Sequence, residues 1–393
     1  MIRFDEEFLK DPASAYARLR AEGPVHRAET PDGAQVWLVT GYDDVRALLG
    51  DPRLSLDKAT SSGGYRGLSL PPALDKNLLN MDAPEHTRLR KVLGKAFTRG
   101  QVERLRPRVA EIAGELLDGL SSRADLIAEY AAPLPIAVIC ELLGVPAADA
   151  SGFRGWTDRI LLPASPEDAK EALVAMYGFL TGLIAAKRAE PGEDLLGTLV
   201  TLDELTEDEL LSAAFLLLFA GYENVVHQIG NGVAALLARP DQLAAVLADP
   251  ALLPSTVDEL LRFEPPGPLA IRRFPLEDVE IGGVTIPAGD TVMLAVASAH
   301  RDGSRFPDPD VLDVHRTENP HVGFGHGPHF CLGAPLARLE LETGLGMLLK
   351  RFPGMRLAVA PEELRWRPSF RTRGLAELPV IVFPPDGTVV PDP

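Results

Sequence analysis

The feature that most constrains this chain is the segment Phe324–Gly333, which presents a single cysteine, Cys331, on a glycine-containing loop just before a patterned helix. Gly325 and Gly333 let the backbone turn tightly and approach a flat partner closely. Pro335 suits a first helical turn, and apolar spacing continues behind it. The sulfur is therefore expected near a helix N-terminus, where free N–H groups and the helix dipole favour a thiolate. A thiolate presented in this way is suited to bind a metal.

The order Phe-Gly-x-Gly-x-His-x-Cys-x-Gly in this segment resembles the haem-binding loop of the cytochrome P-450 superfamily, the haem-thiolate monooxygenases. The resemblance implies haem b as the cofactor and Cys331 as the axial ligand of its iron, where a thiolate favours O–O cleavage. It also implies that Phe324 packs beside the haem and that His329 reaches a haem propionate. Gly325 and Gly333 complete the loop.

Two further segments match the family's propionate-binding positions. Asp82–Arg90 resembles the start of a propionate-binding helix, and its His86 and Arg90 are i, i+4 neighbours that can face one anionic group. Arg273 stands where the family places another propionate arginine. From the residues alone, a surface salt bridge remains the alternative for each of them.

An ExxR element, Glu259-Leu-Leu-Arg262, lies about seventy residues before the cysteine, as the family requires. Its i, i+3 spacing brings carboxylate and guanidinium to one helix face and predicts a buried bidentate pair. Arg316 is the expected third member of this structural cluster.

A long helix is predicted from the capping box at Thr206-Glu-Asp-Glu209 to Arg239, where Pro240 ends the pattern. That is roughly 30 residues, or ~45 Å at 1.5 Å per residue. Gly221 in its middle costs ~1 kcal/mol relative to alanine. A small-residue notch followed by a carboxylate and an amide can admit dioxygen and relay protons. A helix-packing glycine beside a solvent-facing glutamate is the alternative.

The resemblance favours the catalytic interpretation, because Ala220, Gly221 and Glu223 match an Ala-Gly-x-Glu/Asp-Thr segment that covers the distal haem face in the family. The family's threonine, which assists proton delivery, is replaced by Asn224. Asparagine has one acceptor and two donors but no hydroxyl. We expect Asn224, ordered water or a substrate hydroxyl to fill the relay, or the reaction to differ from simple hydroxylation.

Helical patterns dominate the 393 residues, and no linker-like tract divides them, so we expect one domain spanning residues 1–393. Short strands are predicted at Ala34–Thr40, in a hairpin over Val279–Ile286, and from the turn at Asp290 through Ala297. The resemblance implies the cytochrome P-450 fold: mainly α with a minor β region, triangular in outline, with a long central helix over the haem.

The net charge of −17 argues against nucleic acid as a partner. Two cysteines make no disulfide framework, the N-terminus lacks a signal sequence, and the most apolar run, Ala213–Gly221, is shorter than the ~20 residues that span a bilayer. We therefore expect a cytoplasmic protein that does not bind membranes.

One basic segment, Arg88–Arg108, runs against this balance, with eight cations opposed only by Glu103. A solvated face and a docking site for an acidic partner are equally good interpretations. The resemblance implies a ferredoxin or flavodoxin that delivers electrons on the cysteine side of the haem.

Two rival classes are a haem protein that senses or carries ligands without turnover, and a Cys/His zinc protein. Five of the eight histidines precede Cys331 within about thirty residues, but their spacing is irregular and no CxxC pair exists. The favoured function is hydroxylation, or desaturation or coupling, of a medium-to-large hydrophobic small molecule of secondary metabolism. By resemblance, its pocket is lined by Asp57–Asn80, Trp156–Leu183, Leu269–Ile271 and Ser369–Arg373.

Overall fold

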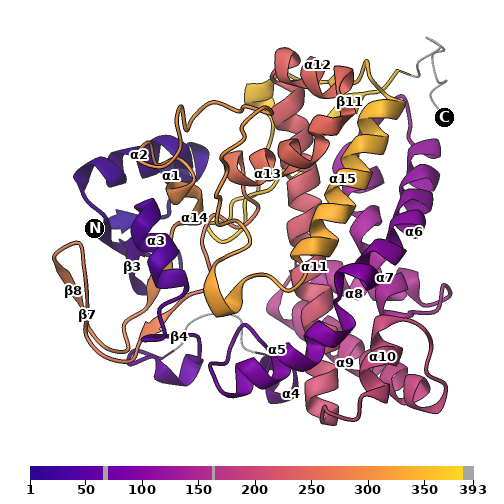
Figure 1. The fold of residues 1–393 in the computed structure, drawn as a ribbon, viewed down its shortest axis with the longest axis horizontal. Coiled ribbons are helices and arrows are strands. Elements are labelled where there is room, and N and C mark those ends of the chain that lie inside the picture. Colours follow the sequence, from indigo (N-terminus) through magenta and orange to yellow (C-terminus); the bar gives the residue numbers. More distant parts are fainter. Residues whose placement is uncertain (65–69, 162–163, 384–393) are drawn as a thin grey trace.

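The computed structural model describes residues 1–64, 70–161 and 164–383, and helices dominate it (Figure 1). The fold is mainly α with small sheets, as predicted. The α-helices are α1 Glu6–Lys10, α2 Pro12–Glu22, α3 Tyr42–Leu49, α4 Pro72–Asp75, α5 Glu85–Ala96, α6 Arg99–Asp118, α7 Pro133–Leu143, α8 Ala150–Leu161, α9 Pro166–Ala189, α10 Leu195–Thr201, α11 Glu207–Leu237, α12 Pro240–Ala248, α13 Leu253–Phe263, α14 Val296–Ala299 and α15 Ala334–Arg351.

The strands are short and form small sheets. One sheet has the order β1-β2-β3-β9 and another the order β10-β11-β5, while β4 pairs with β6 and β7 with β8. Their bounds are β1 Ile2–Arg3, β2 Val25–Glu29, β3 Gln35–Val39, β4 Leu54–Ser55, β5 Arg123–Asp125, β6 Phe274–Pro275, β7 Val279–Ile281, β8 Val284–Ile286, β9 Val292–Leu294, β10 Arg356–Leu357 and β11 Pro379–Ile381. The predicted strand after residue 34 and the hairpin around the glycine pair are both confirmed.

The strand predicted through Ala297 is wrong in its second half. The strand β9 pairs in parallel with β3 only as far as Leu294, which lies opposite Val39. Helix α14 follows at once, and the N–H of Ala299 bonds the carbonyl of Ala295 at 2.9 Å. The run of alanines and serine there has no β-branched residue after Val296, so it takes the helical conformation once the pairing ends.

The long predicted helix is confirmed as α11, with 31 residues, and both halves of the capping box at Thr206 are formed. It stands in the middle of the helical part, between α13 and α15 on one side and α7 and α9 on the other (Figure 1). By length and composition alone, Glu167–Ala189 and Glu207–Leu237 each pass as possible membrane spans. For α11, 61% of the apolar window is buried in the protein, so its hydrophobicity is that of a core helix.

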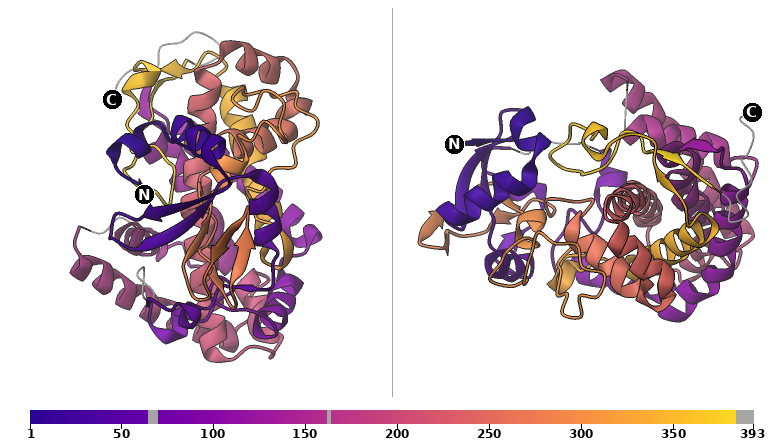
Figure 2. Two further views of the ribbon diagram at one scale, coloured as in Figure 1. Left: turned by 90° about the vertical axis from the view of Figure 1, so that its left-hand side faces the viewer. Right: turned by 90° about the horizontal axis from the view of Figure 1, so that it is seen from above.

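The buried apolar side chains form three clusters. The largest surrounds α11 and joins helices α4 to α13 with α15. The other two hold the sheet of β1, β2, β3 and β9 against α3, α14 and the N-terminal helices. Figure 2 shows this sheet-bearing part gathered at one end of the molecule, beside the helices.

Candidate functional site

The loop that carries Cys331 adopts the geometry expected from its glycines. Gly325 and Gly327 have φ angles of +77° and +73°, a region that glycine occupies without strain. The backbone N–H of Cys331 donates to the carbonyl oxygen of Phe324 at 2.8 Å, which closes the loop. Helix α15 then begins at Ala334 with Gly333 as its N-cap residue. The sulfur therefore lies at a helix N-terminus, as predicted.

The thiol of Cys331 is accessible to solvent but lies among densely packed atoms. Desolvation raises its pKa, while hydrogen bonds from the N–H groups of Gly333 and Ala334 and the positive charge of Arg90 oppose that shift. A metal that binds the sulfur deprotonates it outright. The two N–H donors are then available to the thiolate. The loop thus fits a thiolate ligand to iron.

Phe324 lies beneath the guanidinium of Arg338, 4.5 Å from ring centroid to guanidinium carbon, and Arg338 bonds Asp258 at 2.9 Å. Its ring is therefore held in place next to the cysteine loop.

Three of the four predicted propionate contacts, His86, Arg273 and His329, come together although they are far apart in sequence. The rings of His86 and His329 are 3.9 Å apart between centroids, and His329 and Arg273 are close enough to repel each other electrostatically. Arg90 adds charge beside His86, and its Nη2 donates to the carbonyl of Phe330 at 2.6 Å. Four basic side chains from three segments therefore share one region.

This cluster lacks matching negative charge. Asp82 is the carboxylate that acts on His86, Arg273 and His329, and it is already bonded by Ser55 and by the N–H of Leu56. Burial lowers the pKa of Arg273 to about 10 and that of His329 to about 4.

Within the described residues, Nε2 of His86 is buried without a hydrogen-bond partner. Buried cations without counter-charges are costly. The cluster therefore fits a ligand with two carboxylates, as the propionates of haem b provide.

The predicted residues in the middle of α11 point in two different directions. Ala220 and Asn224 are exposed although most of the helix is buried, and they share one face because they are four residues apart. Nδ2 of Asn224 donates to the carbonyl of Ala220 at 3.2 Å. Glu223 points elsewhere, and its Oε1 lies 3.4 Å from Nε2 of His227. The carboxylate and the amide therefore do not face the same space.

Gly221 is not explained by helix packing. A Cβ added there would meet Ile139 at 3.5 Å, an ordinary contact. Gly230 and Gly232 are the tightly packed glycines of α11, since an added Cβ would lie 2.5 Å from Ile127 and 2.9 Å from Leu260. The packing of α11 against Ile139 of α7 would therefore tolerate an alanine at position 221.

The ExxR pair has the predicted bidentate geometry inside the protein. Arg262 donates from Nε and Nη2 to the two carboxylate oxygens of Glu259 at 2.8 and 2.7 Å, with both side chains fully buried. Arg316 reaches Oε2 of the same carboxylate at 3.1 Å, and Asn319 reaches it at 3.2 Å. Arg262 also bonds the carbonyl of His300 at 2.9 Å. The cluster fastens the chain that leads to the cysteine loop onto α13.

The histidines before Cys331 are dispersed into separate contacts. His300 accepts from the N–H of Val322 at 2.9 Å, and His321 lies 3.3 Å from Asp258. Over the described ranges of the chain, no three His, Cys, Asp or Glu side chains gather as metal ligands. The zinc alternative finds no support here.

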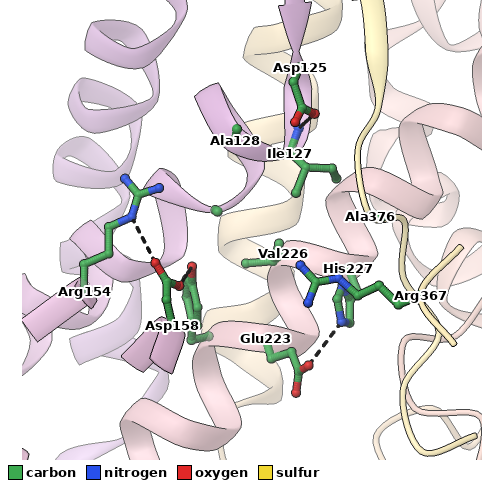
Figure 3. A pocket seen from close by; sticks show the side chains of 12 residues that line it. Asp125, Ile127, Ala128, Arg154, Asp158, Glu223, Val226, His227, Arg367 and Ala376 are labelled. Atoms are coloured by element: carbon green, nitrogen blue, oxygen red, sulfur yellow. Dashed lines mark hydrogen bonds and ion pairs between the residues drawn. The ribbon is translucent and has the colours of Figure 1, made fainter. Parts of the chain in front are cut away.

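One group of polar residues was not predicted. His227 is 1% exposed and shares a cavity with Arg154, Asp158, Glu223 and Arg367 (Figure 3). The i, i+4 spacing of Glu223 and His227 is a signal that the sequence does contain. The other partners come from α8 and from the C-terminal segment, which no local pattern connects to α11.

The comparisons with known proteins agree with this geometry. The sequence profile of the family described as "Cytochrome P450" matches residues 176–363. The chain is 50% identical to cytochrome P450 monooxygenase PikC of Streptomyces venezuelae, over 95% of this chain and 92% of that protein.

Mycinamicin IV hydroxylase/epoxidase of Micromonospora griseorubida is 45% identical over 94% of this chain and 95% of its own length. The solved structure of the tirandamycin C-bound P450 monooxygenase TamI superposes with a TM-score of 0.91 at 46% identity, covering 97% of this chain and all (100%) of that one. The chain therefore belongs to the cytochrome P450 family and is a haem-thiolate monooxygenase.

Proposed function

We propose that this monooxygenase hydroxylates a medium-to-large hydrophobic small molecule of secondary metabolism, with desaturation or coupling as the alternative outcomes. The observation that carries the proposal is near-full-length similarity to enzymes of that kind. Among them are PikC, the mycinamicin IV hydroxylase/epoxidase and, at 42% identity, 6-deoxyerythronolide B hydroxylase of Saccharopolyspora erythraea. We infer a cytoplasmic location for this protein, as its sequence leads us to expect.

The residues of the cysteine loop are assigned to holding the cofactor. Haem b, when bound, supplies the activation of dioxygen and the transfer of one oxygen atom to the substrate. Cys331 is its axial ligand, and the N–H groups of Gly333 and Ala334 stabilise the thiolate. Phe324 packs beside the ring, and the φ of Gly325 lets the loop pass close to it.

The cationic cluster is assigned to the propionates. His86, Arg273 and His329 neutralise the two carboxylates, which in turn relieve the mutual repulsion of these side chains. Arg90 adds positive charge while its bond to Phe330 ties α5 to the cysteine loop. The Glu259, Arg262 and Arg316 cluster keeps that loop in register.

The face of α11 with Ala220, Gly221 and Asn224 is assigned to the oxygen-binding side. Small side chains at 220 and 221 leave room there, and Asn224 offers its carbonyl oxygen because its amide nitrogen already bonds Ala220. Glu223 supplies an acid on the adjoining face of the helix.

For electron delivery we infer an acidic ferredoxin or flavodoxin at the basic segment. Four of its cations are taken by acids of this chain, in the pairs Arg88–Glu209, Lys95–Glu204, Arg106–Glu103 and Arg108–Glu141. Three exposed cations form no ion pair with an acid in the described part of the chain, although Glu103 acts on Arg99 electrostatically: Lys91, Arg99 and Arg104. Lys91 borders an open groove of about 460 Å³ with Arg90, Pro328 and Leu332, next to the cysteine loop. This groove supports docking close to Cys331.

The test of cofactor and ligand is the difference spectrum of the reduced, carbon-monoxide-bound protein. A thiolate-bound band is expected for the wild type and for Cys140→Ala, whose thiol is buried in α7 and has its pKa raised to about 11 by burial. The band should be lost in Cys331→Ala. Retention of the band in Cys331→Ala would remove Cys331 from the iron.

The test of turnover is oxygen-dependent product formation with a ferredoxin, its reductase and NADPH. Substrates are first chosen by the low-to-high-spin shift that they cause on titration. A protein that shows the band and the spin shift but forms no product would be a sensor or carrier instead of a monooxygenase.

A further inference from the structure

A charged cavity lies along α11 on the side that Glu223 faces. It has a volume of about 260 Å³, and its walls come from the π-helical turn Ile127–Ala131, from α8, from α11 and from the C-terminal segment (Figure 3). Seven of its lining side chains carry polar or titratable groups: Asp125, Arg154, Asp158, Tyr222, Glu223, His227 and Arg367. A polar cavity of this size has room for several water molecules.

One end of this cavity opens to solvent. The side chains of Arg154 and Asp158 on α8 are 40% and 49% exposed and lie 3.8 Å apart. The hydroxyl of Tyr222 donates to Oδ1 of Asp158 at 3.0 Å, which links α8 to α11. At the inner end Glu223 is 20% exposed and His227 only 1%. The walls therefore lead from surface charges to a buried imidazole.

His227 is unusual for a buried polar side chain. Neither ring nitrogen makes a hydrogen bond in the part of the chain that the structure describes, although Nε2 lies 3.4 Å from Oε1 of Glu223. Buried polar groups are rarely left in this state without water or a functional reason. The ring is also clamped in place, because a Cβ added at Gly374 would collide with it.

The position of His227 on the helix connects two faces. It follows Glu223 by four residues and Asn224 by three, so it is a surface neighbour of both. Glu223 borders the cavity, whereas Asn224 and Ala220 lie on the exposed face assigned to oxygen binding. His227 is thus placed between the water of the cavity and the side of the helix where the family's threonine is missing.

We propose that His227 is a positioning residue for proton delivery: it holds the carboxylate of Glu223 at the inner end of this cavity and links the cavity water to Asn224. The proposal rests on the proposed function of the α11 face. A neutral imidazole accepts a proton at one ring nitrogen and releases one from the other, so the link moves protons without net consumption. For each dioxygen molecule, one oxygen atom enters the substrate and the other leaves as water. The water takes two protons from solvent, and the cavity is their source.

The first experiment does not depend on turnover. In the reduced, carbon-monoxide-bound holoenzyme labelled with ¹⁵N-histidine, the ring signals of His227 are identified by their loss in His227→Gln. These signals are expected to move in Glu223→Gln, because the ring loses the neighbouring carboxylate. The matched control is Glu207→Gln on the first turn of α11, where Glu207 pairs with Arg188 at 2.7 Å. The pairing of His227 with Glu223 would be refuted if the His227 signals did not shift in Glu223→Gln, or if they shifted equally in Glu207→Gln.

The second experiment tests proton transfer with hydrogen peroxide and guaiacol, which need neither the natural substrate nor a redox partner. With haem bound, cleavage of peroxide would need a proton to be moved onto the oxygen that leaves as water, so the rate would report on proton delivery by the residues of α11. We expect His227→Phe to lower the rate by about tenfold or more and to change its pH profile. The same substitution at exposed His315 is the control.

The groups that face His227 and shape the wild-type pH profile are Asp125, Arg154, Asp158, Tyr222, Glu223 and Arg367. An unchanged rate and pH profile in His227→Phe would overturn the proposal. Should His227→Phe fail to fold, Gly374→Ala displaces the intact ring and is expected to give the same loss. If the wild-type protein lacks the carbon-monoxide band, the proposed function is wrong. This result is known before either measurement on His227 is made.

Discussion

Asn224 stands where the family resemblance leads us to expect a threonine, and its side chain is oriented by its own helix. Its amide nitrogen bonds the carbonyl of Ala220 four residues earlier. A threonine hydroxyl can make the same i−4 bond and passes a proton through a single oxygen, whereas the amide donates from its nitrogen and accepts only at its separate oxygen.

We expect Asn224→Thr to raise product formed per NADPH by roughly twofold or more and to lower peroxide leakage. Asn224→Val, of similar size to threonine but without polar atoms, should do the opposite. Equal ratios in all three proteins would exclude position 224 from the relay.

Glu340 in α15 is a buried acid that has no assigned role in binding the cofactor or in the oxygen-binding face of α11. It is 2% exposed, and its Oε2 has no hydrogen-bond partner over the described residues. Burial raises its pKa well above the ordinary value of a glutamate. The native state therefore keeps the carboxyl protonated, while the unfolded chain ionises it near 4.5. The contribution of Glu340 to the free energy of unfolding is therefore most favourable below pH 4.5, and it declines as the pH rises above 4.5.

We expect Glu340→Gln to raise the free energy of unfolding at pH 7 by about 1–3 kcal/mol, because the amide has no charge to bury. The gain over wild type should shrink toward pH 4.5. Urea unfolding of both proteins across this pH range is the measurement, and a gain that grows on acidification would contradict the assignment.

At the scale of an element, α11 contains glycines with opposite roles. A Cβ at Gly221 meets Ile139 at an ordinary 3.5 Å, whereas one at Gly230 would press on Ile127 at 2.5 Å. Helix propensity favours alanine by ~1 kcal/mol at both positions. Packing cancels that gain only at 230.

We therefore expect Gly221→Ala to stabilise the haem-free protein by up to about 1 kcal/mol and Gly230→Ala to destabilise it by about 1–3 kcal/mol. In the haem-loaded protein the two variants should differ in the opposite sense. Gly221→Ala should weaken carbon monoxide binding, and Gly230→Ala should not. Thermal unfolding and carbon monoxide titration separate the two effects. A loss of stability in Gly221→Ala would assign the glycine to packing after all.

For the whole molecule, the distribution of charge matters more than its sum. The chain carries a net charge of −17, yet the exposed cations Lys91, Arg99 and Arg104 on α5 and α6 form no ion pair among the described residues. A surface of this kind accelerates the encounter with an acidic protein at low ionic strength.

We expect the double variant Lys91→Glu and Arg99→Glu to slow reduction by an acidic ferredoxin by about tenfold or more at low salt. The rates of variant and wild type should converge as salt is raised. Lys350→Glu, the same change at the far end of α15, is the control. A deficit that persists unchanged at high salt would mean damage to the fold instead of lost attraction.

The residues that could be predicted from the sequence are those whose partners are a few positions away. The cysteine loop, the caps and length of α11, and the Glu259–Arg262 pair all follow from glycine placement, capping chemistry and helical spacing. The end of the strand at Leu294 could not be predicted, because it depends on where β3 stops pairing.

By itself, then, the sequence determined three things: the thiolate loop, the long helix α11 and the family to which the chain belongs. The loop and the helix could be predicted because they rest on local geometry. The tertiary structure decided which distant charges meet. It brought His86, Arg273 and His329 together, used acids to neutralise half of the basic segment, and turned Glu223 and His227 toward Asp158 and Arg367. The reason is physical: contacts between remote segments depend on the path and burial of the whole chain, and no short-range spacing encodes them.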